Sequence, residues 1–385
     1  MPTTACPFCF SKIDSSKLGF LCAGQGHEKC AKEADPIRVK ITGNGTPLGR
    51  YLEPTLAVKK GLARCDRCQG ETRRRACTVC RSPLSIDFVD SKNPMLGMVG
   101  SKGAGKTVLM TVMIQQLRRV IAHRFNADIA IATDNPDGMN SITDYMKDRE
   151  QDLYKEGHLP SPTPTFEGNK GRVPIVLRWR ANKKSTMMAF LDSAGEDFDN
   201  EESASALRYL AACEYLIVAL DPFSLPGARD QISLPQQAIQ SADNAATYAL
   251  HQITNKLRTN QGNAKKKIQI PVAIVFTKID AFFPELDEDN PVLATAPAVD
   301  SYDEAGGQAV HERIKVLLKE WDAWEIDSHM NQYYDDYRYF GVSALGAQPN
   351  YSLGDVASGG VRPHRIEDPI LWLLSKAKMV RTVKP

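Results

Sequence analysis

The stretch Gly100-Ser101-Lys102-Gly103-Ala104-Gly105-Lys106-Thr107 has the spacing G-x-x-x-x-G-K-T. Glycines in such a loop let the backbone wrap closely around phosphate oxygens, and successive amide N–H groups with the following helix N-terminus hold the charge. The flanks fit, because an apolar run precedes the loop and a run with helical spacing follows from Val108. The pattern predicts a nucleoside-triphosphate site lined by residues 100–108. Lys106 would reach the β- and γ-phosphates, and Thr107 would bind Mg²⁺.

A second pattern resembles a motif that selects guanine as the base of the bound nucleotide. The apolar run from Pro271 ends in Thr277-Lys278-Ile279-Asp280. The Asp280 carboxylate would accept two hydrogen bonds from guanine, whereas adenine lacks that pair of donors and would leave the carboxylate unpaired. Lys278 would lay its aliphatic stem over the base. A later strand, 337–342, runs into Ser343-Ala344-Leu345, whose backbone amides would read guanine O6. Together these loops predict GTP.

The γ-phosphate sensor is predicted at Asp192-Ser-Ala-Gly195, which follows an apolar strand. Asp192 would hold Mg²⁺ through a water, and the Gly195 N–H would contact the γ-phosphate. We choose Thr163, with Thr165 as the alternative, as the switch I threonine that binds Mg²⁺, because it lies in a proline-rich stretch suited to a loop ordered by γ-phosphate. Glu196 stands where self-sufficient GTPases often have Gln. We therefore expect slow intrinsic hydrolysis, or help from a partner.

Lys102 occupies a P-loop position where many small GTPases keep glycine. Its ammonium would either approach the γ-phosphate or point to solvent, and we favour solvent.

Cysteines concentrate near the N-terminus, where eight of the nine precede residue 81. Three C-x2-C pairs and two further thiols are typical of zinc sites with four thiolate ligands. Because the remaining motifs indicate a reducing compartment, we prefer zinc to disulfides. The predicted ligands of two zinc ions are Cys6, Cys9, Cys22, Cys30, Cys65, Cys68, Cys77 and Cys80.

The pairing of these ligands is open. We favour local pairing, with Cys65, Cys68, Cys77 and Cys80 in one site and the other four in the second. An interleaved arrangement would join Cys6 and Cys9 to Cys65 and Cys68. His27 is the alternative to Cys30 as a ligand, although a surface histidine fits better.

Three further features of the sequence lead to structural predictions. Alternating Ile37, Val39 and Ile41 predict strands within residues 37–58 that join the two sites. Arg73-Arg74-Arg75 is either a solvated tip or a contact for nucleic acid or an acidic protein, and we favour the solvated tip. Cys213, at the edge of an apolar strand, is predicted to be a core thiol.

The composition and length of the chain limit the class of protein it can be. The 385 residues are 42% hydrophobic and 24% charged, as in globular proteins with two or three domains. Neither a secretion signal nor an apolar run long enough for a membrane span is found, so a cytoplasmic protein is expected. Residues 1–90 carry 15 Lys+Arg against 9 Asp+Glu, but eight thiolates on two zinc ions would offset most of this excess.

The order of the predicted strands and helices indicates an α/β fold. Strands alternate with helices from residue 95 onward, which predicts a doubly wound, mostly parallel sheet with one antiparallel hairpin at 174–191. Helices are expected near 107–123, 140–156, 202–212, 234–258, 304–325 and 369–378. Residues 223–235 and 282–303 are expected to be surface insertions. The predicted domains are a zinc-ribbon region, 1–90, and a P-loop GTPase domain, 91–385.

With these motifs placed, the chain resembles TRAFAC-clade GTPases, and more narrowly the bacterial zinc-ribbon GTPases grouped as double-GTPase-like proteins. The resemblance also uses Leu159-Pro-x-x-Thr163, Ala219-Leu-Asp221-Pro222 and Asp368-Pro-Ile-Leu-Trp-Leu-Leu374. It implies a role in bacterial conflict or defence systems beside partner and effector proteins, and a second GTPase on another chain.

Three functions follow from these expectations. The leading one is a GTP-hydrolysing switch whose zinc ribbons recruit a protein partner, with a possible nucleotide-dependent dimer. The second is a zinc protein that binds nucleic acid under control of the GTPase domain. The third is a scaffold that binds GTP without turnover.

Overall fold

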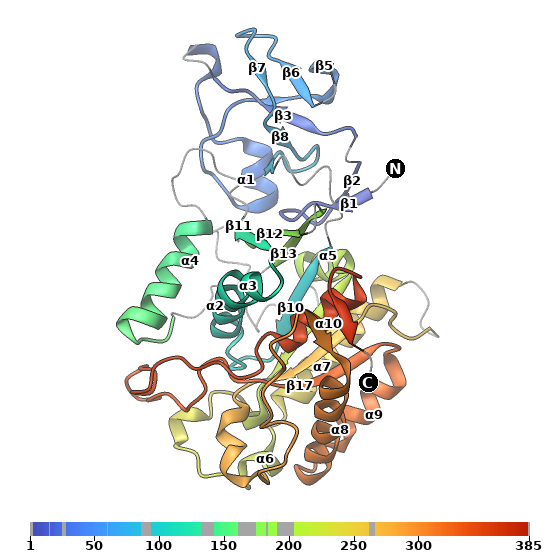
Figure 1. The fold of residues 1–385 in the computed structure, drawn as a ribbon. Helices are drawn as coiled ribbons and strands as arrows, with labels where there is room; N and C mark the ends of the chain where they lie inside the picture. Colours follow the sequence, from blue (N-terminus) through green and yellow to red (C-terminus); the bar gives the residue numbers. More distant parts are fainter. Residues whose placement is uncertain are drawn as a thin grey trace. The chain divides into compact units, whose positions relative to one another are not determined.

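The computed structural model describes residues 3–14, 16–24, 28–59, 61–85, 94–131, 142–160, 175–181, 184–190, 204–261 and 266–383 (Figure 1). Contacts divide the chain into two compact units. The first comprises Met1–Met95, Ile129–Tyr145 and Phe166–Leu191, and the second comprises Leu96–Asp128, Met146–Thr165 and Asp192–Pro385.

The N-terminal part of the first unit is built from short antiparallel strands. A two-stranded sheet pairs β1 (Thr3–Ala5) with β2 (Lys12–Asp14). A four-stranded sheet has the order β4-β3-β8-β9, with strands Tyr51–Leu52, Gly19–Leu21, Arg75–Ala76 and Pro83–Leu84. A three-stranded sheet has the order β5-β6-β7, with strands Ala57–Lys59, Leu62–Arg64 and Glu71–Thr72. Two short 3₁₀ turns, Glu28–Cys30 and Pro54–Leu56, complete this part.

The strand prediction at Ile37 to Ile41 is wrong, because α1 (Pro36–Thr42) is a helix. Asp35 caps its start by accepting hydrogen bonds from two backbone N–H groups, and Pro36 occupies the first turn, where its missing donor costs nothing. Gly43, at φ 71°, ends the helix in the left-handed conformation. Three alternating apolar residues were too short a pattern to outweigh these caps.

The remaining strands of the first unit form the predicted antiparallel hairpin. β12 (Ile175–Ala181) pairs with β13 (Lys184–Phe190) from Ile175 opposite Phe190 onward. β11 (Asp128–Ile131) completes this sheet in the order β11-β12-β13.

The second unit is centred on a parallel sheet with the order β10-β14-β15-β17. Its strands are Leu96–Gly100, Tyr215–Leu220, Val272–Phe276 and Tyr337–Gly341. Their neighbours are all parallel, and nearly every residue is buried, as expected for a sheet covered on both faces. The predicted α/β fold is confirmed. In a parallel sheet the carboxyl ends of all strands lie at one edge, which brings the loops after them together.

The helices after α1 largely follow the predicted ranges, and all lie in the second unit except the start of α4, which belongs to the first. They are α2 (Lys106–Gln116) continued by η4 (Leu117–Ile121) and α3 (Ala122–Arg124), α4 (Ile142–Gln151) continued by η5 (Asp152–Glu156), α5 (Ala204–Ala212), α6 (Pro226–Arg229), α7 (Ala245–Gln261), α8 (Glu304–Glu320), α9 (Trp324–Tyr333) and α10 (Asp368–Lys376). Short 3₁₀ turns lie at Pro222–Ser224, Gln236–Ala238 and Ile279–Glu285, and β16 (Ser301–Asp303) pairs in parallel with β18 (Arg381–Val383).

Two predicted helices differ in extent. The helix expected from residue 234 begins only at Ala245, because Asn244 takes a positive φ of 59°. The helix expected over 304–325 is two helices, because Asp322 at φ 51° breaks it. The supposed surface insertions also contribute to the core, since Phe223 and Phe282 are each 1% exposed.

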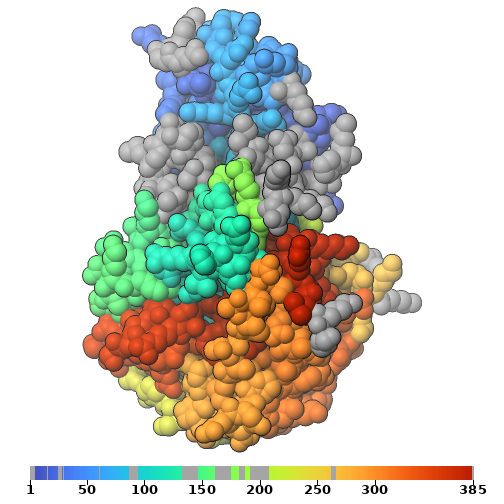
Figure 2. All heavy atoms as spheres, in the orientation of Figure 1, coloured from blue at the N-terminus to red at the C-terminus, as the bar shows by residue number. Residues whose placement is uncertain are grey.

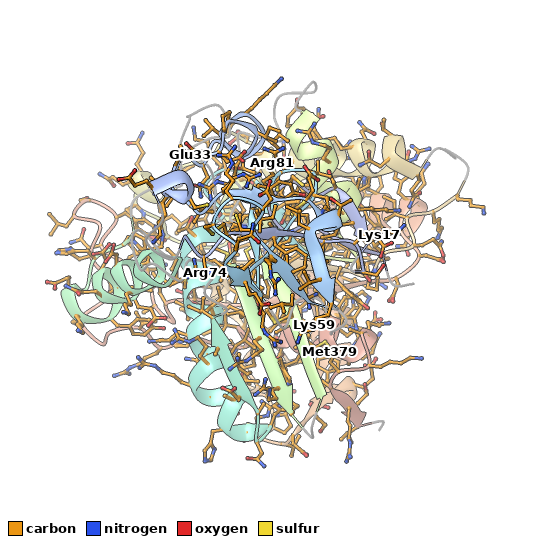
Figure 3. All side chains as sticks on the ribbon, turned by 90° about the horizontal axis from the view of Figure 1, so that it is seen from above. Lys17, Glu33, Lys59, Arg74, Arg81 and Met379 are labelled. Atoms are coloured by element: carbon orange, nitrogen blue, oxygen red, sulfur yellow. The ribbon has the colours of Figure 1, made fainter. Side chains whose placement is uncertain are left out.

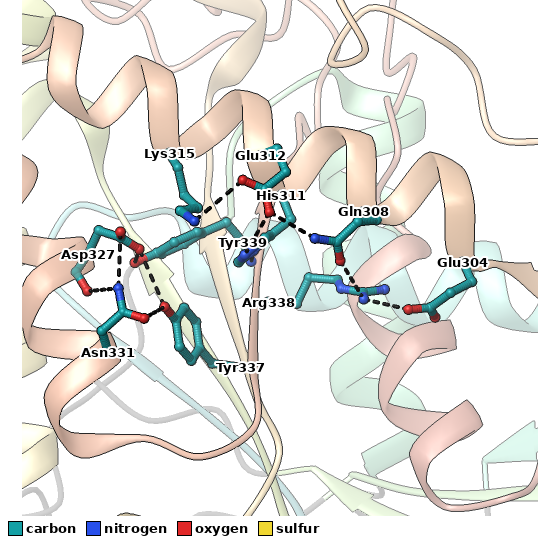
Figure 4. Close-up of polar contacts among 10 residues, drawn as sticks. All are labelled: Glu304, Gln308, His311, Glu312, Lys315, Asp327, Asn331, Tyr337, Arg338 and Tyr339. Atoms are coloured by element: carbon teal, nitrogen blue, oxygen red, sulfur yellow. Dashed lines mark hydrogen bonds and ion pairs between the residues drawn. The ribbon is translucent and has the colours of Figure 1, made fainter. Parts of the chain in front are cut away.

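Polar side chains protect the free edge of the sheet at β17 (Figure 4). The Tyr339 N–H donates to Nδ1 of His311 from α8 at 3.0 Å, and the Tyr339 hydroxyl donates to Asp327 of α9 at 3.1 Å. Burial lowers the pKa of His311 to about 4, so its neutral ring can accept the hydrogen bond. Arg338 is held on the same strand by Glu304 at 2.5 Å. His311 of α8 therefore satisfies a backbone N–H that would otherwise be unpaired at this edge.

Among the described residues, no helix is both long and apolar enough to cross a membrane.

Candidate functional site

The glycine-rich loop joins the carboxyl end of β10 to the start of α2, as the motif predicts. Gly100, at φ 150°, lies so close to β14 that an added Cβ would be 1.9 Å from the Ala219 carbonyl oxygen. The Ser101 N–H donates to that same oxygen at 3.1 Å. Gly105 precedes the helix at φ 68°, a conformation that favours glycine. The loop is therefore packed against the sheet and presents the N-terminus of α2, which is a ready-made anion site.

Lys106 folds back over this loop. Its side chain is buried, and Nζ donates to the carbonyl oxygens of Gly100 at 3.1 Å and Ser101 at 2.8 Å. The ammonium therefore lies inside the curve of the loop, where the phosphates of a nucleotide are expected. Thr107 follows in the first turn of α2, and Lys102 is exposed.

The predicted base-reading residues lie after the next strands of the same sheet. Thr277 follows β15 and donates from N–H and Oγ1 to the Leu220 carbonyl at 3.1 and 3.2 Å. Asp280 is the second residue of the 3₁₀ turn Ile279–Glu285 that follows. Burial raises the pKa of Asp280, while a hydrogen bond from the Ser343 side chain and the charge of Lys278 oppose that rise. Ser343, which follows β17, is therefore beside Asp280, as the two motifs require of a shared guanine site.

Ala344 and Leu345 continue the loop from Ser343. The Gly346 N–H donates to Ser343 Oγ at 2.7 Å, and Leu345 accepts from the Arg362 N–H at 2.8 Å. These bonds fix the backbone whose amides are expected to read the base.

A residue that the motifs did not single out for a role links both halves of the site. Asp221 follows β14, and its side chain is 0% exposed. Its carboxylate accepts from the Phe223 N–H at 3.0 Å and pairs with Lys278 Nζ at 2.9 Å. Lys278 also lies over the Phe223 ring, 4.9 Å from the centroid. Asp221 thus holds the lysine that is expected to cover the base.

The same carboxylate reaches the P-loop through a serine. Ser241 Oγ lies 3.5 Å from Asp221 Oδ2 and donates to the Lys102 carbonyl at 2.6 Å. The Asp221 N–H donates to Ser101 Oγ at 3.3 Å. The available signal was the acidic residue directly after a buried strand of the parallel sheet, at the edge where ligands bind.

Four predicted residues lie outside the described residues: Thr163, Asp192, Gly195 and Glu196. The same holds for Thr165 and His27. Their roles stay predictions.

Eight cysteines of the first unit form two groups of four. One group contains Cys6, Cys9, Cys77 and Cys80, and the other contains Cys22, Cys30, Cys65 and Cys68. Within each group, two pairs of sulfur atoms lie 3.5 to 3.9 Å apart. A tetrahedron of thiolates around zinc, with Zn–S of about 2.3 Å, places its sulfurs about 3.8 Å apart. The donor sets therefore fit two zinc ions, and all eight cysteines are free of disulfides.

This grouping corrects both predicted pairings. Neither the local pairing nor the interleaved one with Cys65 and Cys68 is present, because Cys6 and Cys9 join the last C-x2-C pair instead. Short spacing along the chain suggested a local ribbon, but each group joins cysteines from segments far apart in the sequence.

The three C-x2-C pairs share one backbone geometry. In each, the residue after the second cysteine has a positive φ and donates its N–H to the carbonyl of the first cysteine; these residues are Phe10, Gln69 and Arg81. The first cysteine donates its own N–H to a carbonyl beyond the turn, at 2.9 Å in all three. Such turns direct both sulfurs of a pair to one side, as a metal site needs.

Cys213 is, as predicted, a core thiol: it is 6% exposed, and its sulfur donates to the Tyr209 carbonyl at 3.2 Å.

The basic side chains of the first unit are partly neutralised. Lys17, Lys59, Arg74 and Arg81 are labelled in Figure 3. Arg81 pairs with Asp35 at 3.2 Å. Two further ion pairs join Arg50 to Asp66 and Arg64 to Glu71. These pairs reduce the charge that could attract a nucleic acid.

A parallel sheet with a glycine-rich loop and a buried loop lysine at the end of β10 fits the fold of a P-loop domain. The model of the family Double-GTPase 2 matches residues 94–315, more than half of the 385 residues, and the chain belongs to this family. The predicted resemblance to double-GTPase-like proteins is thereby confirmed, and membership indicates a GTPase-like domain. No curated protein matches the chain significantly.

Proposed function

We propose that the protein binds GTP with Mg²⁺, hydrolyses it slowly, and acts as a switch whose zinc-bearing region recruits a protein partner. The observation that carries this proposal is the convergence of loops at one edge of the parallel sheet. The P-loop follows β10, Asp221 follows β14, Thr277 to Asp280 follow β15, and Ser343 follows β17. The proposed domains are residues 1–90 and 91–385.

The described residues divide the work of binding. The backbone of residues 100–108 and the Lys106 ammonium bind the phosphates, and Thr107 is a ligand for Mg²⁺. Asp280 accepts from guanine, with Lys278 over the base and Ser343 to Leu345 at its O6. Magnesium neutralises phosphate charge when it is bound.

The residues proposed for GTP hydrolysis are assigned from sequence patterns alone. Asp192 and Thr163 complete the Mg²⁺ site, Gly195 senses the γ-phosphate, and Glu196 orients the attacking water. Because Glu196 carries a negative charge next to the γ-phosphate, hydrolysis is slow without a partner. The family membership and the two zinc sites support a role in assembly with other proteins, and we place it in bacterial defence by resemblance.

The base specificity is tested by competition binding with the full chain. A fluorescent GDP analogue in Mg²⁺ buffer is displaced by GTP, ATP or xanthosine triphosphate. We expect GTP to displace it and ATP not, because adenine cannot satisfy Asp280. Asp280→Asn should shift the preference to the xanthine nucleotide, whose extra carbonyl accepts from the new amide. Equal competition by ATP and GTP would exclude the guanine site.

Hydrolysis is measured separately. A single-turnover assay with radiolabelled GTP compares the wild type, Glu196→Gln and Lys106→Ala. We expect slow phosphate release in the wild type and none in Lys106→Ala. Bound GTP that is never cleaved, alone or with co-purified partners, would identify a GTP-binding scaffold instead.

A further inference from the structure

An arm of residues 346–362 extends from the predicted base-reading loop and returns to it. At its ends, Ser343 and His364 exchange backbone hydrogen bonds of 3.0 and 2.8 Å, and the Arg362 N–H donates to Leu345 at 2.8 Å. Gly346 takes φ +80°, and an added Cβ there would lie 1.9 Å from the Arg362 carbonyl oxygen. The arm is therefore closed at its base, and its base is the loop expected to read guanine.

The tip of the arm is an ordered turn. The Asn350 N–H donates to the Asp355 carbonyl and the Gly354 N–H donates to the Asn350 carbonyl, both at 2.8 Å. The Asn350 side chain accepts from the N–H groups of Ser352 and Leu353 at 3.1 and 3.2 Å. These bonds give the tip a defined shape.

The tip is bound to the segment that follows η5. The Leu159 N–H donates to the Gly354 carbonyl at 2.7 Å, and the Val356 N–H donates to the Gly157 carbonyl at 2.8 Å. His158 Nδ1 lies 2.6 Å from an Asp355 carboxylate oxygen. In the space-filling view the red-orange atoms of this region lie directly beneath the green atoms of the α4 region (Figure 2). The arm is thus bonded to a segment that lies nearly 200 residues earlier in the sequence.

One side chain of the arm, Tyr351, is partly buried. Burial raises the pKa of the Tyr351 hydroxyl, and the carboxylates of Asp280 and Asp221 raise it further. The charges of both carboxylates therefore act on the Tyr351 hydroxyl. Leu353, two residues on, is 71% exposed, so the two side chains differ in burial.

We propose that the arm is a part of the nucleotide site, with the Tyr351 ring packed against the bound guanosine and the contact to residues 157–159 holding it there. This inference rests on the proposed function, because it needs guanine at Asp280. The aromatic ring supplies a flat apolar surface, which stabilises a stacked base without regard to its hydrogen-bonding pattern. Release of the tip would uncover the base, so Tyr351 controls nucleotide retention while Asp280 controls base identity.

The test measures GDP affinity and dissociation in the full chain with a fluorescent GDP analogue and Mg²⁺. Tyr351→Ala should raise the Kd and the dissociation rate about tenfold or more, the range expected for losing one stacked aromatic ring. Tyr351→Phe keeps the ring and should behave as the wild type. Leu353→Ala, at an exposed position of the same arm, is the matched control and should also leave both values unchanged.

A second pair of variants tests the attachment. His158→Ala with Asp355→Ala removes the side-chain contact but keeps the backbone bonds, and should speed GDP dissociation severalfold. Replacing residues 347–361 by an Asn-Gly turn is compatible with the close approach of Gly346 and Arg362, and should match or exceed the loss in Tyr351→Ala.

The outcomes are distinct. If the wild type binds GDP but Tyr351→Ala and the shortened arm release it at the wild-type rate, the inference is wrong and the proposed function stands. If the wild type binds no guanine nucleotide, both are wrong. An equal loss of GDP and GTP affinity in Tyr351→Ala would support a base-stacking role, since the two nucleotides share the base and differ only in the γ-phosphate.

Discussion

Removing the charge of Asp221 should weaken both the fold and the nucleotide site. Its carboxylate is fully buried and uses one oxygen for the Phe223 N–H and the other for Lys278. In Asp221→Asn the side chain keeps its size but has a single acceptor oxygen. Either the backbone N–H or the ammonium must therefore face an amide nitrogen.

The magnitude follows from the burial of the two partners. Breaking a buried ion pair by changing one member costs about 3–5 kcal/mol. The side chain of Lys278 is 20% exposed, so water can partly solvate its ammonium. We therefore expect the free energy of unfolding to fall by about 2–3 kcal/mol. A typical domain has about 5–15 kcal/mol, so the variant should still fold.

Urea unfolding followed by tryptophan fluorescence measures this loss, and GDP binding should weaken about tenfold because Lys278 is no longer held over the base. Asp243→Asn is the matched control: Asp243 pairs with Arg229 at 2.6 Å but its side chain is 65% exposed, so its loss should cost under about 0.5 kcal/mol. The reasoning fails if Asp221→Asn unfolds and binds GDP as Asp243→Asn does.

Three further outcomes are expected. Elemental analysis should find about two zinc ions per wild-type chain, one when Cys6 and Cys77 are both changed to Ser, and none when Cys6 and Cys65 are changed; equal zinc in the two double variants would contradict the observed groups. Because burial raises the pKa of Asp280 above the usual value of about 3.9, and guanine needs the carboxylate form, GDP affinity should be constant above that raised pKa and fall below it. A pH-independent Kd down to pH 4 would refute this. Burial lowers the pKa of His329 to about 4, so the unfolded chain binds its proton first, and stability should drop by roughly 3 kcal/mol from pH 6.5 to 4. Urea titrations of the wild type and His329→Gln should differ in that window.

The parallel sheet was predictable from the sequence because its strands are continuous apolar runs bounded by motif loops. Val272 to Phe276 is entirely buried, and Thr277 to Asp280 follow it directly. The apolar pattern of this strand agrees with its burial in the sheet. The motif that follows the strand in sequence therefore lies at the end of the strand in the structure.

The zinc groups were not predictable in the same way. Every cysteine can pair locally or at long range with the same ligand chemistry, and the choice depends on which distant segments the fold brings together. The contacts of Asp221 and Ser241 were missed for a related reason. Each residue contacts a distant segment, and a serine in a loop carries no signal of its own.

The order of the cysteine contacts has a consequence for biosynthesis. The sulfur contacts are nested: Cys30 with Cys65 and Cys22 with Cys68 span 35 and 46 residues, inside contacts that span 68 and 74 residues. Because loop closure becomes costlier with length, closing the inner site first shortens the effective loop left for the outer one. The inner ligands are also all synthesised before the last C-x2-C pair. During synthesis the ligands of the inner site would thus be complete before those of the outer site. Binding of a metal ion at the inner site would then bring the outer ligands closer together.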